Sequence, residues 1–136
     1  MDGLKIGEVA RQAEVNLQTL HYYERRGLIP KPPRTDSNYR SYPAEAVRRV
    51  RFIKRAQELG FTLKEIKDLL SLRAAPRTRC ADVRRRAKIK VQDIEGKVRT
   101  LRAMRKALNK LIGECSGKGP VTECPILDAL DPEDKR

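Results

Sequence analysis

The 136-residue sequence contains no tryptophan, a single histidine and only 4% aromatic residues. A large aromatic-lined cofactor pocket is therefore not expected. No hydrophobic run approaches the ~20 residues needed to cross a bilayer. The first residues, MDGLKIGEVA, lack the pattern of a signal peptide. We therefore expect a cytoplasmic protein.

Catalytic patterns are also missing. The sequence has no clustered carboxylates, no Ser/His/Asp set and no phosphate-binding loop. Its length allows one modest core, or a small domain with an appendage, but not two full enzyme domains. The sequence therefore does not predict an enzyme.

Basic residues, by contrast, are in large excess. Lys and Arg number 31 against 18 Asp and Glu, which gives a formal net charge of +13. Such an excess favours a polyanionic partner, and nucleic acid fits better than a membrane surface.

Two short helices are predicted near the N-terminus. Residues 5–13 carry apolar residues at helical spacing, and a tight turn at residues 13–15 follows. Asn16 is a suitable N-cap for a second helix to about Arg26, and Gly27 ends it. In a basic protein, two helices around a tight turn indicate a helix-turn-helix.

Residues 28–42, called the wing below, contain three prolines and no helical period. The Asp-Ser-Asn punctuation predicts a β-hairpin, with Asn38 in a left-handed conformation. Pro43 is expected in the first turn of a third helix that ends at Gly60 and turns Leu59 inward. Thr62 and Glu65 form a capping box that opens a fourth helix, which closes before Pro76.

The longest predicted helix runs from about residue 81 to 113. Its apolar residues recur in steps of three and four, as in a coiled-coil seam. They are Val83, Ala87, Val91, Ile94, Val98, Leu101, Met104, Leu108 and Leu111. The opposite face, which includes Lys90, is charged and is expected to be solvated.

Three cysteines remain, and an odd number argues against a disulfide framework. Cys80 precedes the long helix and Cys115 follows it, so a straight helix would separate them by about 52 Å. An antiparallel homodimer would pair residue i with roughly residue 195 − i, and would bring Cys80 of one chain beside Cys115 of the other. The loop after Cys115 would return Cys124 to the same place, and Gly96 would lie near the centre.

Thiolates are soft ligands, and three of them suit Hg(II) better than Zn(II), which prefers four ligands. A soft-metal sensor is therefore predicted. A thiol redox sensor, a drug-binding regulator and a metal buffer without a DNA role are the alternatives.

Four segments resemble the MerR family of regulators, namely IGEVA, TLHYYERRGLI (19–29), NYRSY (38–42) and RFIKRAQELGFTLKEIKDLL (51–70). The resemblance covers nearly all of residues 5–130. It implies a mainly α fold, with a winged helix-turn-helix DNA-binding domain, a long antiparallel coiled-coil dimerisation helix and a C-terminal metal-binding loop. The corresponding expected ranges are 1–75, 76–113 (with a linker) and 114–136.

The resemblance also implies partners and contacts. A homodimer would bind double-stranded promoter DNA, repress without metal and, with metal, distort the DNA so that RNA polymerase can use the promoter. The positions that match DNA-contacting residues of the family are Gln18, His21, Tyr22, Arg34, Tyr39 and Arg40. This sequence departs from the family at His21, where Arg is frequent, and at Glu14, where Gly is frequent.

Cys80, Cys115 and the Cys124-Pro125 pair resemble the mercury-responsive members, which regulate mercury-resistance operons. Hg(II) is therefore the expected inducer. Pb(II) and Cd(II) remain alternatives, because sensors of these metals use similar cysteine triplets.

Overall fold

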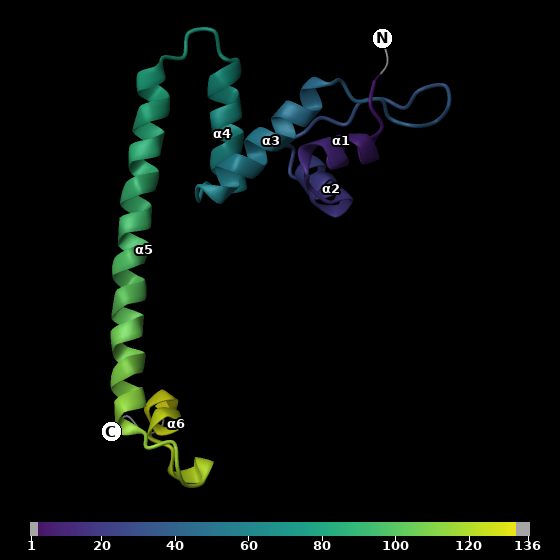
Figure 1. The fold of residues 1–136 in the computed structure, drawn as a ribbon. Helices are drawn as coiled ribbons and strands as arrows, with labels where there is room; N and C mark the ends of the chain where they lie inside the picture. Colours follow the sequence, from purple (N-terminus) through teal and green to yellow (C-terminus); the bar gives the residue numbers. More distant parts are fainter. Residues whose placement is uncertain (1–2, 133–136) are drawn as a thin grey trace. The chain divides into compact units, whose positions relative to one another are not determined.

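The computed structural model describes residues 3–132, and this part of the chain is mainly helical (Figure 1). This part of the chain contains no β-strand, only two isolated antiparallel β-bridges. The chain divides into two compact units, Met1–Lys90 and Val91–Arg136. The expectation of a mainly α fold is confirmed. None of the described helices is long and apolar enough to cross a membrane.

The first two helices, α1 (Ile6–Ala13) and α2 (Leu17–Arg25), flank the predicted tight turn. Glu14 in this turn has a left-handed backbone with φ of 59°. Asn16 caps α2 as predicted, because its side-chain oxygen accepts a hydrogen bond of 2.7 Å from the Thr19 backbone N–H.

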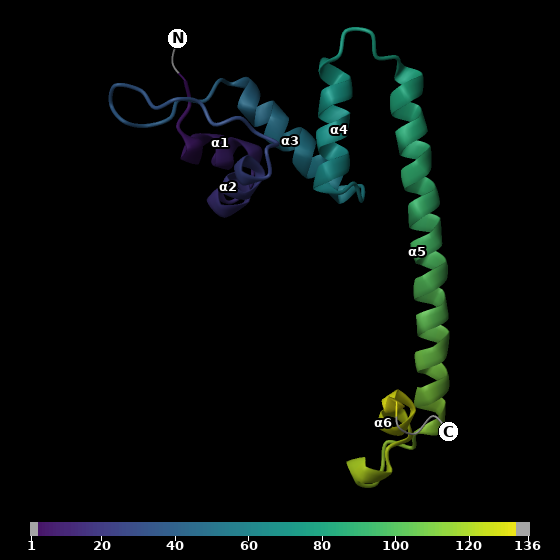
Figure 2. The same ribbon diagram turned by 180° about the vertical axis from the view of Figure 1, so that it is seen from behind.

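The wing reverses direction through a turn at Asn38, whose φ of 63° is left-handed as predicted. The prediction of a β-hairpin is wrong in its extent. Only Arg34 and Arg40 form an antiparallel bridge within the wing, and Tyr42 forms another with Leu4. Prolines lack the N–H that a longer ladder needs. Figure 2 shows the wing as an open loop beside α1 and α2.

Helix α3 (Glu45–Glu58) supplies much of the core through Val47, Val50 and Ile53, which are buried against α1. Pro43 lies two residues before this helix, not in its first turn as predicted. Leu59 is 58% exposed, so its predicted inward position is also wrong. The helix ends at Glu58 and Leu59 is its C-cap, so the inward face stops at Ala56.

Helix α4 (Leu63–Ala74) begins with the predicted capping box. The Thr62 backbone N–H donates a hydrogen bond to the Glu65 carboxylate, and the Glu65 backbone N–H donates one to the Thr62 hydroxyl. Glu65 also pairs with Lys90 of α5 (Cys80–Glu114) at 2.8 Å. Lys90 is only 5% exposed, so its predicted place on a solvated face is wrong. The Lys90 side chain lies beside the Phe61 ring, and the carboxylate of Glu65 neutralises its charge.

Helix α5 is continuous over 35 residues. Its predicted apolar stripe lies open in the protomer: Val91, Ile94, Val98, Leu101, Met104 and Leu108 are 38–62% exposed. After α5, a loop, a short 3-10 turn (Val121–Glu123) and α6 (Pro125–Leu130) complete the described chain.

Candidate functional site

The exposed face of α2 carries three of the predicted DNA-contacting residues. Gln18, His21 and Tyr22 are exposed, while Leu20, Tyr23 and Glu24 on the other face are buried. The spacing of three and four residues puts the exposed three on one side of the helix. These side chains are therefore available to a ligand outside the protomer.

Arg25 and Arg26, which were not predicted as DNA contacts, lie beside Tyr22. Both guanidinium groups lie over the Tyr22 ring, at 5.6 and 5.7 Å from its centroid. Arg26 also donates a 2.8 Å hydrogen bond to the Tyr22 hydroxyl. Their place at helical spacing next to Tyr22 was the signal that could have identified them.

The wing carries the other three predicted residues. Arg34 donates a hydrogen bond to the Asn38 carbonyl at 3.3 Å, and Arg40 donates one to the Pro32 carbonyl at 2.5 Å. The Lys5 ammonium lies 4.9 Å from the centre of the Tyr39 ring. These contacts hold the basic side chains in the bent loop, and they leave Arg34 and Tyr39 exposed.

The wing, α2 and the start of α1 line an open cavity of about 380 Å³. Its basic lining comprises Lys5, His21, Lys31, Arg34 and Arg40, with Glu24 as the acidic residue. Lys5 and Lys31 were not predicted as site residues, because only the folded wing brings them beside His21. Such a concave basic surface suits a phosphate group.

The three predicted metal ligands are all free thiols. Cys80 is the first residue of α5 and is exposed. Cys115 directly follows α5, and Cys124 is the N-cap of α6. Cys80 and Cys124 therefore each lie at a helix N-terminus, where the helix dipole favours a thiolate.

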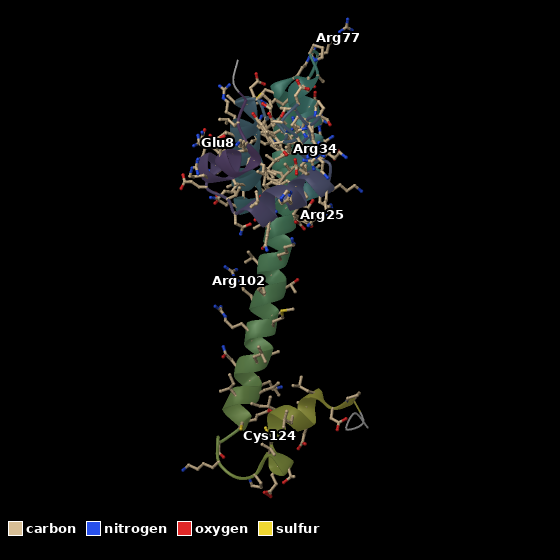
Figure 3. All side chains as sticks on the ribbon, turned by 90° about the vertical axis from the view of Figure 1, so that its right-hand side faces the viewer. Glu8, Arg25, Arg34, Arg77, Arg102 and Cys124 are labelled. Carbon is tan, nitrogen blue, oxygen red and sulfur yellow. The ribbon has the colours of Figure 1, made fainter. Side chains whose placement is uncertain are left out.

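The loop after α5 brings Cys115 and Cys124 to one cavity of about 300 Å³, lined by residues 114–121 and 123–125. Gly117 and Gly119 allow this reversal, since their φ angles of 77° and 93° are strained for other residues. Figure 3 labels Cys124 in this segment. In residues 3–132 of one protomer, no group of three potential metal ligands occurs.

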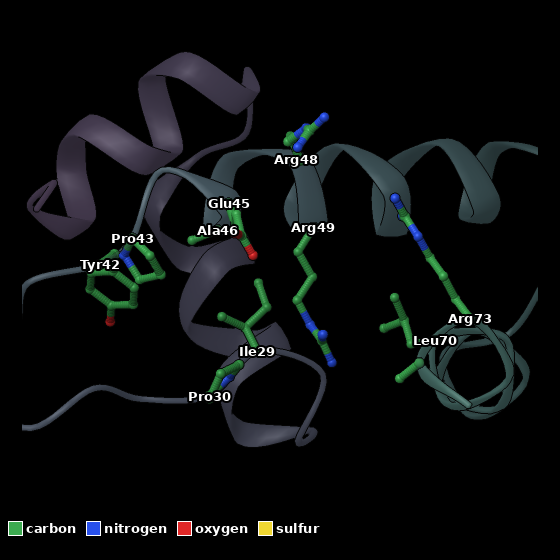
Figure 4. A pocket seen from close by; sticks show the side chains of 11 residues that line it. Ile29, Pro30, Tyr42, Pro43, Glu45, Ala46, Arg48, Arg49, Leu70 and Arg73 are labelled. Atoms are coloured by element: carbon green, nitrogen blue, oxygen red, sulfur yellow. The ribbon is translucent and has the colours of Figure 1, made fainter. Parts of the chain in front are cut away.

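A separate groove of about 410 Å³ lies between α3, α4 and the segment around Pro43. Figure 4 shows Leu70 and Arg73 of α4 facing Arg49 of α3 across it. Arg49 is engaged by the Leu28 carbonyl at 2.6 Å. None of the predicted site residues lines this groove.

Two family models match the chain. One is described as MerR HTH family regulatory protein and matches residues 4–72; the other, described as MerR, DNA binding, matches residues 47–111. A mercuric resistance operon regulatory protein of Bacillus cereus is 42% identical over 93% of this chain and 96% of its own length.

The chain is also similar to solved structures, among them two regulators in complex with a metal ion. The transcription regulator PbrR691 from Ralstonia metallidurans CH34, in complex with lead(II), has a TM-score of 0.81 and 34% identity, and the match covers 94% of this chain and 99% of that one. The regulator MerR from Bacillus megaterium MB1, in complex with mercury(II), has a TM-score of 0.69 and 37% identity, with coverage of 93% and 98%.

Proposed function

The chain belongs to the MerR family of DNA-binding transcription regulators, and on that premise we propose that it regulates a mercury-resistance operon in response to Hg(II). The observation that carries this proposal is the set of three free thiols at the two ends of α5. A metal-ion inducer fits the family relatives with bound metal, and the choice of mercury rests on the ligand set.

Each segment has a separate task in this proposal. Residues 1–75 bind DNA through Gln18, His21 and Tyr22 on α2 and through the wing residues Arg34, Tyr39 and Arg40. Residues 76–113 form the dimer, and residues 114–136 complete the metal site. Contacts from the wing would mostly hold phosphates and set the position of α2 on the duplex.

The exposed stripe on α5 supports a dimer. A helix with so many half-exposed apolar side chains is stable when a second element covers them. The surface around Gly96 is hollowed, and a Cβ at this glycine would meet only the Arg99 side chain, at 3.7 Å. The protomer itself therefore does not require a glycine here, whereas close approach of a second helix does.

An antiparallel pair also completes the metal site. Cys115 and Cys124 share a cavity within one protomer, and Cys80 of the partner subunit would supply the third thiolate. Two-fold symmetry gives two such sites per dimer. Three thiolates favour a soft ion over Zn(II), and Pb(II) or Cd(II) would use the same ligands.

The output is a change in the DNA. The dimer binds a palindromic operator within a promoter and represses it; metal binding distorts the operator so that RNA polymerase can use both promoter elements. Bending a DNA site of about 20–30 base pairs costs about 1–6 kcal/mol, which protein–DNA contacts must offset.

Anaerobic titration under reducing conditions tests this function. The purified dimer is titrated with Hg(II), Pb(II), Cd(II) or Zn(II) while thiolate-to-metal absorption and transcription in vitro from its promoter are followed. We expect Hg(II) to act at the lowest concentration. Induction by Pb(II) or Cd(II) at lower concentration would reassign the metal, and induction by peroxide alone would favour a thiol redox sensor.

Substitution of the thiols tests the ligand set. Cys80→Ser, Cys115→Ser and Cys124→Ser should each abolish induction and leave operator binding intact, because each removes one of three ligands far from α2 and the wing. Ser116→Ala, in the same loop, is the matched control and should induce normally. A cysteine variant that still induces would remove that residue from the site.

A further inference from the structure

His21 faces a buried carboxylate from the surface of α2. Its Nδ1 lies 3.4 Å from Oε1 of Glu24, one helical turn later. The His21 side chain is 49% exposed, whereas that of Glu24 is 2% exposed. The imidazole is thus held from beneath while its outer edge is open to a ligand.

Glu24 is itself fixed by the end of the wing. The hydroxyl of Tyr42 donates a hydrogen bond to Oε2 of Glu24. Tyr42 is 1% exposed, and its backbone N–H and carbonyl both pair with Leu4. Burial, together with the hydrogen bond to Glu24, raises the pKa of Tyr42 well above its ordinary value, so this hydroxyl keeps its proton and remains a donor. A buried carboxylate with such a partner has little freedom to move.

This arrangement decides what the outer nitrogen of His21 can do. When the imidazole is neutral, the carboxylate favours the proton on Nδ1, and Nε2 is then an acceptor. An acceptor cannot bind a phosphate oxygen. When the imidazole is protonated, both nitrogens are donors, and Nε2 can donate to phosphate while Nδ1 donates to Glu24.

Several charged groups share the cavity with His21. Lys5 precedes α1, and Lys31, Arg34 and Arg40 come from the wing, as do the phenols of Tyr39 and Tyr42. The four cations disfavour a positive charge on the His21 imidazole, whereas the Glu24 carboxylate favours it. A DNA phosphate that enters the cavity adds negative charge, so it favours protonation of His21.

We propose that Glu24 is a positioning residue that makes His21 a phosphate ligand only as the imidazolium, so that operator binding takes up a proton and weakens as pH rises. The proposal rests on the proposed function, in which the exposed face of α2 contacts the operator.

Operator affinity measured by fluorescence anisotropy from pH 5.8 to 8.2, at constant ionic strength, tests the proposal. Wild type should lose roughly 25-fold in affinity across this range, because each of the two His21 side chains of the dimer contributes about five-fold, the value of one charge-assisted hydrogen bond at a partly exposed site. His21→Arg, which stays charged, should bind tightly with little pH dependence. His21→Gln should bind weakly at every pH.

Glu24→Gln separates positioning from mere support of the fold. The glutamine keeps an acceptor for Tyr42 but removes the charge beneath His21. Since His21 is the only histidine, one NMR signal reports its protonation. We expect its titration midpoint to fall in Glu24→Gln and to rise when wild type binds the operator, while circular dichroism shows unchanged thermal unfolding.

Two results would overturn the proposal: wild type and His21→Arg with the same pH profile, or a His21 midpoint that does not respond to operator. The second measurement uses wild type alone, so it decides even if Glu24→Gln fails to fold. Wild type that binds no operator at any pH would contradict the proposed function as well. Tight binding with a flat profile would contradict only the role of Glu24 and His21.

Discussion

At the scale of single residues, the turn between α1 and α2 carries strain. Glu14 has a φ of 59°, and its backbone carbonyl accepts a 2.9 Å hydrogen bond from Lys54. A left-handed backbone costs a residue with a Cβ about 1–2 kcal/mol. The Lys54 ammonium binds only the backbone carbonyl of residue 14, so any residue at position 14 keeps this hydrogen bond.

Glu14→Gly should therefore be more stable than Glu14→Ala. Both variants remove the same side chain, but only glycine adopts positive φ without a steric cost. We expect a difference of about 1 kcal/mol in the free energy of unfolding, measured by urea denaturation of the two variants. Equal stabilities would contradict the strain.

Local residue patterns predicted the helix caps and the left-handed turn residue correctly. The caps at Asn16 and Thr62 and the left-handed Asn38 depend on neighbours within four residues, and each was confirmed. The contact of Glu24 with Tyr42 joins residues 18 apart in sequence. It could not be predicted, because it forms only when the wing packs on α2.

At the scale of helices, α4 and α5 are joined by two ion pairs of different exposure. Lys90 is buried and pairs with Glu65, whereas Arg86 and Asp68 are both largely exposed, at 3.3 Å. The hydrogen bond from Lys90, together with the hydrogen bonds of the capping box, lowers the pKa of Glu65 below its ordinary value of 4.5. The charged form of Glu65 therefore stabilises the fold.

Glu65→Gln should lower the free energy of unfolding by up to about 1 kcal/mol at pH 7. A lowered pKa in the folded state means that this stabilisation is complete above pH 4.5 and is lost as pH falls through the folded value. Thermal unfolding of both proteins from pH 7 to pH 3 measures it. Asp68→Asn, which breaks the exposed pair, is the control and should change little. A gap that persists unchanged at the lowest pH would contradict the role of the charge.

Periodicity and capping residues predicted where the helices begin and end. They did not predict which side chains of different helices pair with one another. The periodic stripe predicted α5 almost to its ends. Lys90 was expected in solvent, since nothing in its local pattern distinguishes it from Lys97, which is 66% exposed. Only the packing of α5 beside Phe61 and Glu65 buries it.

At the scale of the whole molecule, the net charge of +13 should make DNA binding strongly dependent on salt. Each neutralised phosphate releases counterions, and the logarithm of affinity falls with a slope of about −0.9 per contact. Operator affinity should therefore fall at least about hundred-fold between roughly 50 and 200 mM salt. Arg34→Ala should reduce the slope by about two contacts, one from each protomer of the dimer. Arg102→Ala, on the charged surface of α5, is the control and should leave it unchanged (Figure 3). A flat salt response would contradict phosphate contacts by the wing.

The antiparallel pairing of two chains is inferred from features of a single protomer. The distance between the ends of α5, the exposed stripe and the shared cavity of Cys115 and Cys124 all favour an antiparallel pair. They are properties of one chain, and the pairing itself requires a measurement on two.

A mixed dimer provides that measurement most directly. One chain carries Cys80→Ser and the other carries Cys115→Ser with Cys124→Ser, and two different affinity tags isolate the heterodimer for anaerobic Hg(II) titration. If each site takes Cys80 from one chain and the other two thiols from its partner, the heterodimer binds one Hg(II) with three-thiolate absorption, while neither mutant homodimer shows that absorption. A heterodimer that gains no such site would contradict the antiparallel arrangement.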